Sequence, residues 1–261
     1  MTAFTPGEWL LSFVLVTAIL AASEAGFRLG HKAEARIPLK TKPEISAVEG
    51  GILALLGLLL GFTMSMAVTR FEARKLLVLE EANAIGTSYL RAQLLPAAES
   101  ADIRNLLRQY IDVRIQYGDV DEAPARIEII REQAARLQHE IWARAVTYAQ
   151  EDPSPVKSGL LLQSLNEAID LESSRWMAFH NHVPPTVISV NCVLALLAGA
   201  VVGFAFGLQG RRQTFSTCVF AVAVTVVLAV IIDLDTPHRG FIRVSQQPMI
   251  ELQHQVLTSK E

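Results

Sequence analysis

Four apolar stretches alternate with polar segments along the chain, and each is long enough to cross a membrane once its flanking turns are included. They are Trp9 to Ala22, from which a helix can continue to Gly30, Gly50 to Val68, Val183 to Leu208, and Thr214 to Ile232. A helix that rises 1.5 Å per residue needs about 20 residues to cross a hydrocarbon core ~30 Å thick. The pattern therefore predicts an all-α membrane protein with four transmembrane helices.

The second stretch passes into a charged segment with no proline at the join. Arg70, Arg74 and Lys75 follow its last apolar residues, where long basic side chains reach lipid headgroups. One apolar stripe continues past them at helical spacing, which predicts a single helix running from the membrane into the soluble part. The stripe consists of Met64, Ala67, Phe71, Val78, Ala82, Ile85 and Tyr89.

The segment between the second and third spans has the periodicity of further helices. Apolar positions recur at intervals of three and four within 103–117, 127–148 and 162–179. Together with the end of the long helix they make a four-helix bundle inserted between the second and third spans. The expected organisation is 1–69 for the first two spans and their polar loop, 70–182 for a helical extramembrane domain, 183–232 for a transmembrane hairpin, and 233–261 for a C-terminal tail.

Small residues at four-residue intervals mark two of the spans. They are Gly57 and Gly61 in the second span, and Gly199, Gly203 and Gly207 in the third. Glycines at this spacing let helix backbones approach closely in lipid, where van der Waals packing replaces the hydrophobic drive between helices. We therefore expect the second and third spans to make the tight contact.

Polar side chains within the third and first spans need partners. Asn191 is the strongly polar residue of the third span and is expected to face another helix or a cavity. Glu24 and Arg28 lie four residues apart at the end of the first helix. They form either a mutually neutralising ion pair near the headgroups or a site in which the carboxylate faces a pore or polar cavity.

A polar line follows one face of the long helix beyond the membrane. Glu80, Asn83, Thr87 and Arg91 recur at steps of three and four residues. One interpretation is an ordinary exposed face, and the other is a surface lining a central vestibule or a polar network between helices.

Composition argues against several functional classes. A net charge of -3 does not favour nucleic acid as a partner, and no hydrolase, P-loop or zinc-protease motif points to an enzyme. Cys192 and Cys218 lie in apolar runs and are expected to pack as small apolar side chains. Asp233 and Asp235 offer too few carboxylates for calcium, so we expect no metal or cofactor and ion pairing with Arg239 or Arg243.

Four segments resemble the bestrophin-like family of bacterial membrane proteins. The main one is GFTMSMAVTRFEARKLLVLEEANAIGTSYLRAQLLP at 61–96, and the others are EAGFRLG at 24–30, NHVP at 181–184 and DLDTPHRGFIRVSQQP at 233–248. The resemblance implies a homo-oligomer, a pentamer as in bestrophins, in the bacterial inner membrane. It also implies an anion channel. Because four spans, two of them lined with glycine, leave little room for an internal pore, we expect any conduction path on the symmetry axis between subunits.

Two functions follow from these observations. In the first, the second span lines an ion-conducting pore: Thr63 and Ser65 supply hydroxyls, Phe62 and Met64 an apolar constriction, and Arg70, with Arg91, a positive approach for inorganic anions. In the second, the protein is a non-conducting, membrane-anchored helical module that binds a partner or relays a signal. The apolar run ILALLGLLLGFTMSM suits a lipid-facing helix as well as a pore.

The charge balance and the resemblance indicate opposite sides of the membrane for the helical domain. Basic residues near the span ends number seven in the two short loops and six on the other side, and short loops weigh more in the positive-inside rule. This balance leans towards an external domain, whereas the resemblance implies a cytoplasmic one, which we expect. The residues counted are Arg28, Lys32, Arg36, Lys40, Lys42, Arg211 and Arg212 against Arg70, Arg74, Lys75, Arg175, Arg239 and Arg243.

Overall fold

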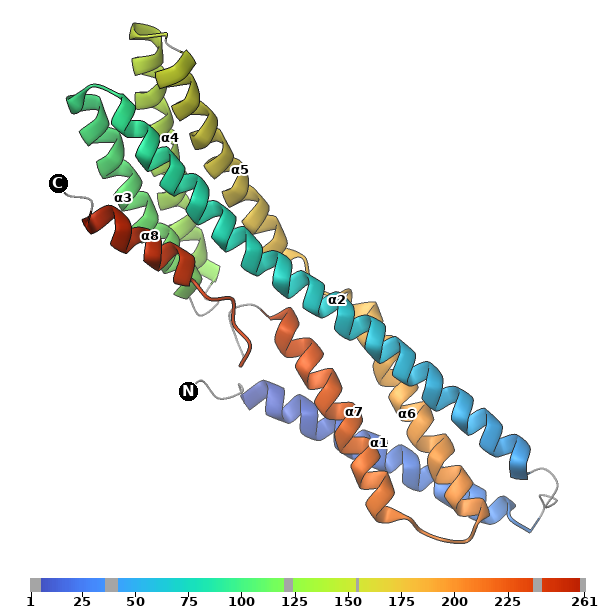
Figure 1. Ribbon diagram of the computed structural model, residues 1–261. Coiled ribbons are helices and arrows are strands. Elements are labelled where there is room, and N and C mark those ends of the chain that lie inside the picture. Colours follow the sequence, from blue (N-terminus) through green and yellow to red (C-terminus); the bar gives the residue numbers. More distant parts are fainter. Residues whose placement is uncertain (1–5, 36–41, 120–123, 154, 237–240, 259–261) are drawn as a thin grey trace. The chain divides into compact units, whose positions relative to one another are not determined.

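The computed structural model describes residues 6–35, 42–119, 124–153, 155–236 and 241–258, and Arg36, Lys40 and Arg239 lie outside them. These residues form helices joined by short connections, with no strand among them (Figure 1). The all-helical prediction is therefore confirmed. The α-helices are α1 (Pro6–Ala33), α2 (Lys42–Arg91), α3 (Ala97–Asp119), α4 (Pro124–Glu151), α5 (Leu160–His180), α6 (Pro185–Leu208), α7 (Thr214–Asp235) and α8 (Gln247–Thr258).

Four helical segments of the described chain are long and apolar enough to cross a membrane. They include α1, the first part of α2, α6 and α7. These are the four spans that the hydrophobic pattern predicts, so that part of the prediction is confirmed. Each contains a run of apolar residues that a helix needs to shield its backbone hydrogen bonds from lipid.

Helix α2 runs without interruption through 50 residues, as the absence of a helix breaker after the second span predicts. Its apolar stripe faces inward: Ala67, Val78 and Ile85 are almost fully buried, and Met64 and Phe71 are half-buried. A stripe at helical spacing keeps one face of a straight helix against its neighbours.

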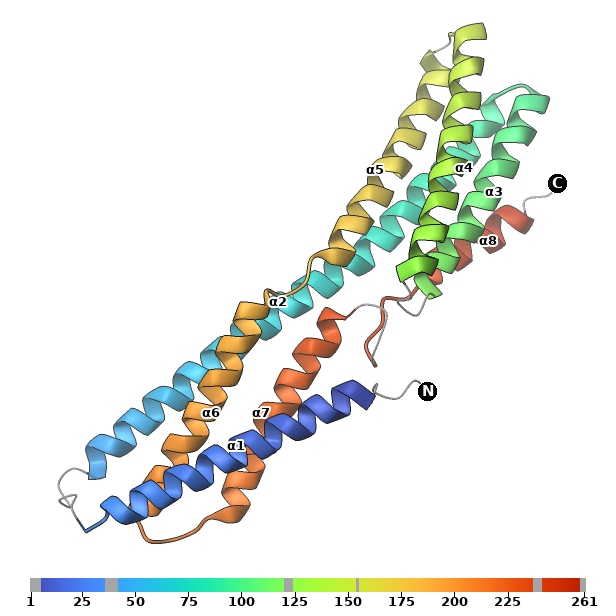
Figure 2. The ribbon, with the colours of Figure 1, turned by 180° about the vertical axis from the view of Figure 1, so that it is seen from behind.

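The chain divides into two compact units, and α2 contributes to both. The bundle unit comprises Arg70–Asn181 and Arg243–Glu261. Within it, the C-terminal part of α2 shares one hydrophobic core with α3, α4, α5 and α8. Helix α3 packs along α4, and α8 lies against α3 (Figures 1 and 2). The sequence did not predict the helix α8, which forms within the C-terminal tail. Core side chains come from all five helices, among them Ile85, Leu107, Ile141, Leu161 and Met249.

The membrane unit comprises Met1–Thr69 and His182–Ile242. Helix α1 packs closely along α6, and α7 also contacts α1 (Figure 2). A short loop joins α6 to α7, as the hairpin prediction requires. The buried side chains here are small or branched, among them Ile19, Ala195, Ala198, Ala221 and Leu228.

Candidate functional site

The tight glycine contact of the membrane unit joins α1 to α6 rather than α2 to α6. A Cβ added at Gly203 would overlap the backbone carbonyl of Ser23, and one added at Gly207 would overlap that of Phe27. Added Cβ atoms at Gly57 and Gly61 would meet nothing within 4 Å among the described residues. The expected pairing of the second and third spans is thus wrong, because α1 brings Gly26 and other small residues to the same seam.

Helices α2 and α6 instead meet through a polar pair. The Asn191 side-chain amide donates a hydrogen bond to the Thr63 hydroxyl at 2.9 Å, and both side chains are almost fully buried. The Thr63 hydroxyl in turn donates to the carbonyl of Leu59 at 2.7 Å. Asn191 therefore faces another helix, as expected, because an amide in lipid is costly without a partner.

The remaining pore candidates of α2 lie on different faces of the helix. Phe62 is 63% exposed within the subunit and Ser65 is also exposed, whereas Met64 and Arg70 are half-buried. Thr63, at 2% exposure, points into the subunit. These candidates therefore do not form one surface, because consecutive residues point in different directions around a helix.

The polar line of α2 is also divided between two grooves. Glu80 lines a groove with α5 residues such as Asn166 and Asp170. Asn83 and Thr87 line a second groove, with α8 residues on its other side. Arg91 donates a hydrogen bond to the carbonyl of Leu160 at 2.7 Å, which ties the end of α2 to the start of α5.

The strongest electrostatic feature is a buried charge network that begins next to this line, at Glu81. Glu81 accepts hydrogen bonds from Arg114 at 2.5 and 3.1 Å and from Arg175 at 2.7 Å. Arg114 also lies 3.6 Å from Glu172, and Arg175 donates to the Gln246 side chain at 2.5 Å. The network joins α2, α3 and α5 to the segment that leads into α8.

Burial shifts the acid–base properties around this network. It raises the pKa of Tyr117 to about 12, against the opposing effect of the nearby guanidinium groups of Arg114 and Arg175. Burial alone raises the pKa of Glu81, but the same two guanidinium groups outweigh it and hold that pKa below its usual value of 4.5. Glu81 is therefore a carboxylate in the folded protein.

The sequence contains one signal for this network: two of its charged residues lie on apolar helix stripes. Glu81 lies in the helical phase of Val78 and Ile85, on the buried stripe, whereas the adjacent Glu80 lies on the exposed side. Arg114 shares the phase of Leu107 and Ile111 in the same way. A charge on an apolar stripe implies a buried partner, but the sequence does not say which residue it is.

The stability of the protein is expected to fall as the pH drops below 4.5. A carboxyl group whose pKa is lower in the folded state stabilises that state above the unfolded pKa and loses its contribution as it becomes protonated. The pKa of Glu81 is lowered in this sense. Thermal unfolding in detergent from about pH 7 to about pH 3 measures the effect, and Glu81→Gln should flatten the profile. An equally steep profile in this variant would assign the pH dependence to other carboxyl groups.

A third buried arginine, Arg74, binds the C-terminal end of α5. The Arg74 guanidinium donates to the carbonyl of Ala178 and to that of Asn181, both at 3.0 Å. The carbonyl of Ala178 also accepts the backbone N–H of Asn181 at 3.4 Å, and a cation at the end of a helix interacts favourably with the helix dipole. Arg74, expected at the headgroups, is 4% exposed and fixes the point where α5 ends.

Two aspartates near the end of α7 bind backbone amides. Asp233 accepts hydrogen bonds from the N–H groups of Phe241 and Ile242, both at 3.0 Å. Asp235 accepts from the N–H group of Val183 at 3.0 Å. The aspartates thus hold the entry to α6 and the exit from α7. Arg239, one of the two expected ion-pair partners, lies outside the described residues.

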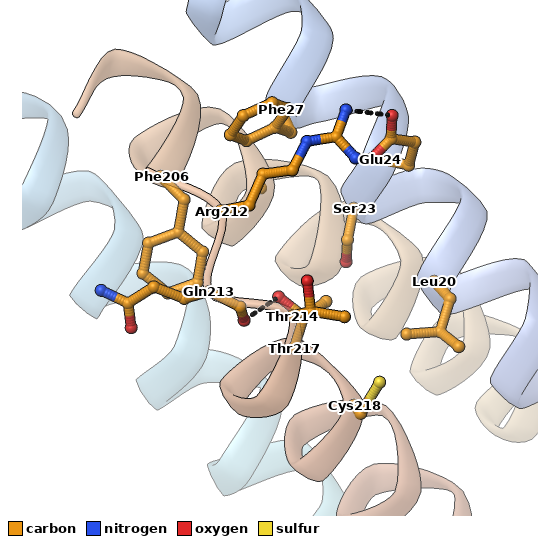
Figure 3. A pocket seen from close by; sticks show the side chains of 11 residues that line it. Leu20, Ser23, Glu24, Phe27, Phe206, Arg212, Gln213, Thr214, Thr217 and Cys218 are labelled. Carbon is orange, nitrogen blue, oxygen red and sulfur yellow. Dashed lines mark hydrogen bonds and ion pairs between the residues drawn. The ribbon is translucent and has the colours of Figure 1, made fainter. Parts of the chain in front are cut away.

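A pocket of about 220 Å³, lined by both charged and apolar side chains, lies between α1, the α6–α7 loop and the start of α7 (Figure 3). Glu24 pairs with Arg28 at 2.8 Å, as expected from their spacing, and also with Arg212 at 3.2 Å. The Arg212 guanidinium lies over the ring of Phe27, 4.7 Å from its centre. Cys218 lies on the opposite side of the pocket (Figure 3).

Comparison with solved structures finds the same fold in bacterial membrane proteins. A crystal structure of a bacterial bestrophin homologue from Klebsiella pneumoniae is 16% identical, with 94% of this chain and 97% of that chain covered and a TM-score of 0.66. A variant of that homologue gives 13% identity, 98% coverage of both chains and a TM-score of 0.71. Comparison with curated proteins finds no match.

Comparison with protein families gives a match over most of the chain. Residues 17–249 match the Bestrophin-like domain, a range that includes the end of the first apolar segment, the other three segments and the charged network around Glu81. The chain therefore belongs to the bestrophin-like family.

Proposed function

We propose that the protein is an oligomeric ion channel of the bacterial inner membrane, with a conduction path on the symmetry axis between subunits. Membership of the bestrophin-like family supports this function. The observation that carries it is an uncovered face on α2 within the membrane unit. A subunit with four candidate spans has little room for a pore of its own, so a path between copies is the simpler arrangement. By resemblance to bestrophins the oligomer is a pentamer.

The uncovered face follows helical spacing through the span. Leu55, Leu58 and Phe62 are 46%, 54% and 63% exposed, and Ser65 and Thr69 continue the line with exposed hydroxyl side chains. A pore between subunits must be lined by residues that each subunit leaves exposed. Phe62 and Ser65 therefore remain in the proposed lining, and the buried Thr63 does not.

This face changes from apolar to polar along the helix. Leu58 and Phe62 would form a constriction that gates by loss of water, and Ser65 and Thr69 would provide hydroxyls next to it. Arg70, half-buried just beyond, would give the path a positive approach that favours anions. The continuous helix α2 links this face to the bundle unit, which we place outside the membrane and in the cytoplasm.

The alternative is a membrane-anchored module that binds a partner and does not conduct. The apolar character of Leu55, Leu58 and Phe62 favours it, because such side chains are equally suited to lipid. The two functions differ in one property that is directly measurable, the current through a bilayer.

Purified protein in planar bilayers, under opposed gradients of chloride and potassium, is expected to give a current that reverses near the chloride potential. In a background with both native cysteines replaced by alanine, Ser65→Cys should lose most of this current when a charged, water-soluble thiol reagent is added. The reason is that a bulky charge on an exposed pore residue blocks both the space and the field in the path.

Thr63→Cys is the matched control, because the neighbouring position is buried and should not react. Wild-type protein that gives no current above empty bilayers, or that has the mass of a monomer in detergent, would contradict the channel and favour the anchored module. Inhibition that is equal in the two variants would place the lining elsewhere.

A further inference from the structure

We propose that Arg104 and Arg108 on α3 dock into an acidic groove between α2 and α5 of a second copy of the chain. The contact goes beyond the conduction path, because it names the surfaces that hold neighbouring subunits together in the bundle unit. It rests on the oligomer of the proposed function but not on conduction. Its basis is two clusters of opposite charge, each without an ion-pair partner among the described residues of its own subunit.

The positive cluster consists of two guanidinium groups that share one aromatic ring. The Cζ atoms of Arg104 and Arg108 lie 5.5 and 5.4 Å from the centre of the Tyr89 ring, and Arg108 also donates a hydrogen bond to the Tyr89 hydroxyl at 2.6 Å. The Nε atoms of both arginines have no acceptor, and no carboxylate of the described residues lies within 4 Å of either group. The ring offsets part of this charge but does not neutralise it. Both side chains are half-buried, so a partner can still reach them.

The negative cluster lines a groove of about 640 Å³ between α2 and α5. Glu80, Glu167 and Asp170 contribute exposed carboxylates to this groove, and its described lining contains no lysine or arginine. Asp170 accepts a hydrogen bond from the neutral side chain of Asn166 at 3.0 Å, which leaves its charge in place. The groove is therefore open to a cation from outside the subunit.

Each cluster places like charges on one face of a helix. Arg104 and Arg108 are four residues apart on α3. Glu167 and Asp170 are three residues apart on α5. Like charges at these spacings repel each other and weaken the helix that carries them. A partner of opposite charge turns both repulsions into attractions, which gives the two clusters a purpose that they lack within one subunit.

The arrangement of the helices suits a ring of subunits. In the bundle unit, α3 and α5 flank the C-terminal part of α2 on opposite sides (Figures 1 and 2). A contact between two different surfaces, repeated by rotation, closes into a ring, whereas a surface that pairs with itself gives a dimer. The path on the symmetry axis requires a ring.

The chemistry of the groove favours an arginine over a metal ion. The described part of the chain has no group of three or more ligand side chains placed to hold a metal. A guanidinium group matches a carboxylate with two parallel hydrogen bonds, and this geometry fixes the register of neighbouring subunits. We therefore assign the groove to a copy of this chain.

Native mass spectrometry of the full-length protein in mild detergent, over a range of protein concentrations, tests the contact. Arg104→Glu with Arg108→Glu brings like charges together across each interface and should raise the concentration at which the oligomer dissociates about tenfold or more. Glu167→Arg with Asp170→Arg should have the same effect. Combining the two double reversals restores opposite charges and should recover most of the oligomer.

Arg126→Glu with Arg136→Glu is the matched control, because it reverses two exposed arginines on α4, outside both clusters. A wild-type oligomer that the α3 reversal weakens no more than the control does would overturn this contact and leave the proposed channel standing. A combined variant that stays dissociated would also overturn it. A wild-type monomer would overturn the contact and the channel together. Circular dichroism identifies a reversed variant that fails to fold, in which case the neutral pair Arg104→Gln with Arg108→Gln takes its place.

Discussion

Replacing Glu81 with alanine is expected to lower the free energy of unfolding by about 3 to 5 kcal/mol. The substitution leaves Arg114 and Arg175, which are 1% and 5% exposed, without the carboxylate that both contact. Glu172, at 3.6 Å from Arg114, offsets only part of the charge. An uncompensated guanidinium group in a core costs much more than the lost hydrogen bonds themselves.

The thermal unfolding midpoint of the full chain in detergent measures this loss. Glu80→Ala is the matched control, since it removes the same group from an exposed position one residue away and should change stability by less than about 0.5 kcal/mol. The double variant Glu81→Ala with Arg175→Met should recover part of the stability, because it removes one of the unpaired charges. Equal midpoints for Glu81→Ala and Glu80→Ala would show that the network contributes little.

Replacing Gly203 with alanine is expected to cost about 3 kcal/mol or more, although it adds a single methyl group. The added Cβ would overlap the carbonyl oxygen of Ser23, which belongs to the backbone of α1 and cannot rotate away. Relief requires α1 and α6 to separate, and this separation weakens the close packing on which helix association in lipid depends.

Gly57→Ala is the control for this second variant. An added Cβ there meets nothing within 4 Å among the described residues, and alanine is the better helix former by about 1 kcal/mol. Unfolding midpoints in detergent should therefore fall for Gly203→Ala and stay the same or rise for Gly57→Ala. The opposite order would show that the tight glycine contact is between α2 and α6, as the sequence predicted.

The sequence by itself determined the features that depend on neighbours along one helix. The four apolar segments, the unbroken course of α2 and its buried stripe all follow from residues a few positions apart. The Glu24–Arg28 ion pair is of the same kind, because residues four apart always meet on one face of a helix.

Only the tertiary structure decided which helices meet and which charges become partners. Spacing identified Gly203 as a packing residue but not α1 as its partner, and it gave Glu81 no priority over Glu80. The pairing of Glu24 with Arg212 is equally invisible in the order of residues. The physical reason is that helix periodicity is set by hydrogen bonds between near neighbours, whereas contacts between distant helices depend on how all the side chains of a unit fill space together.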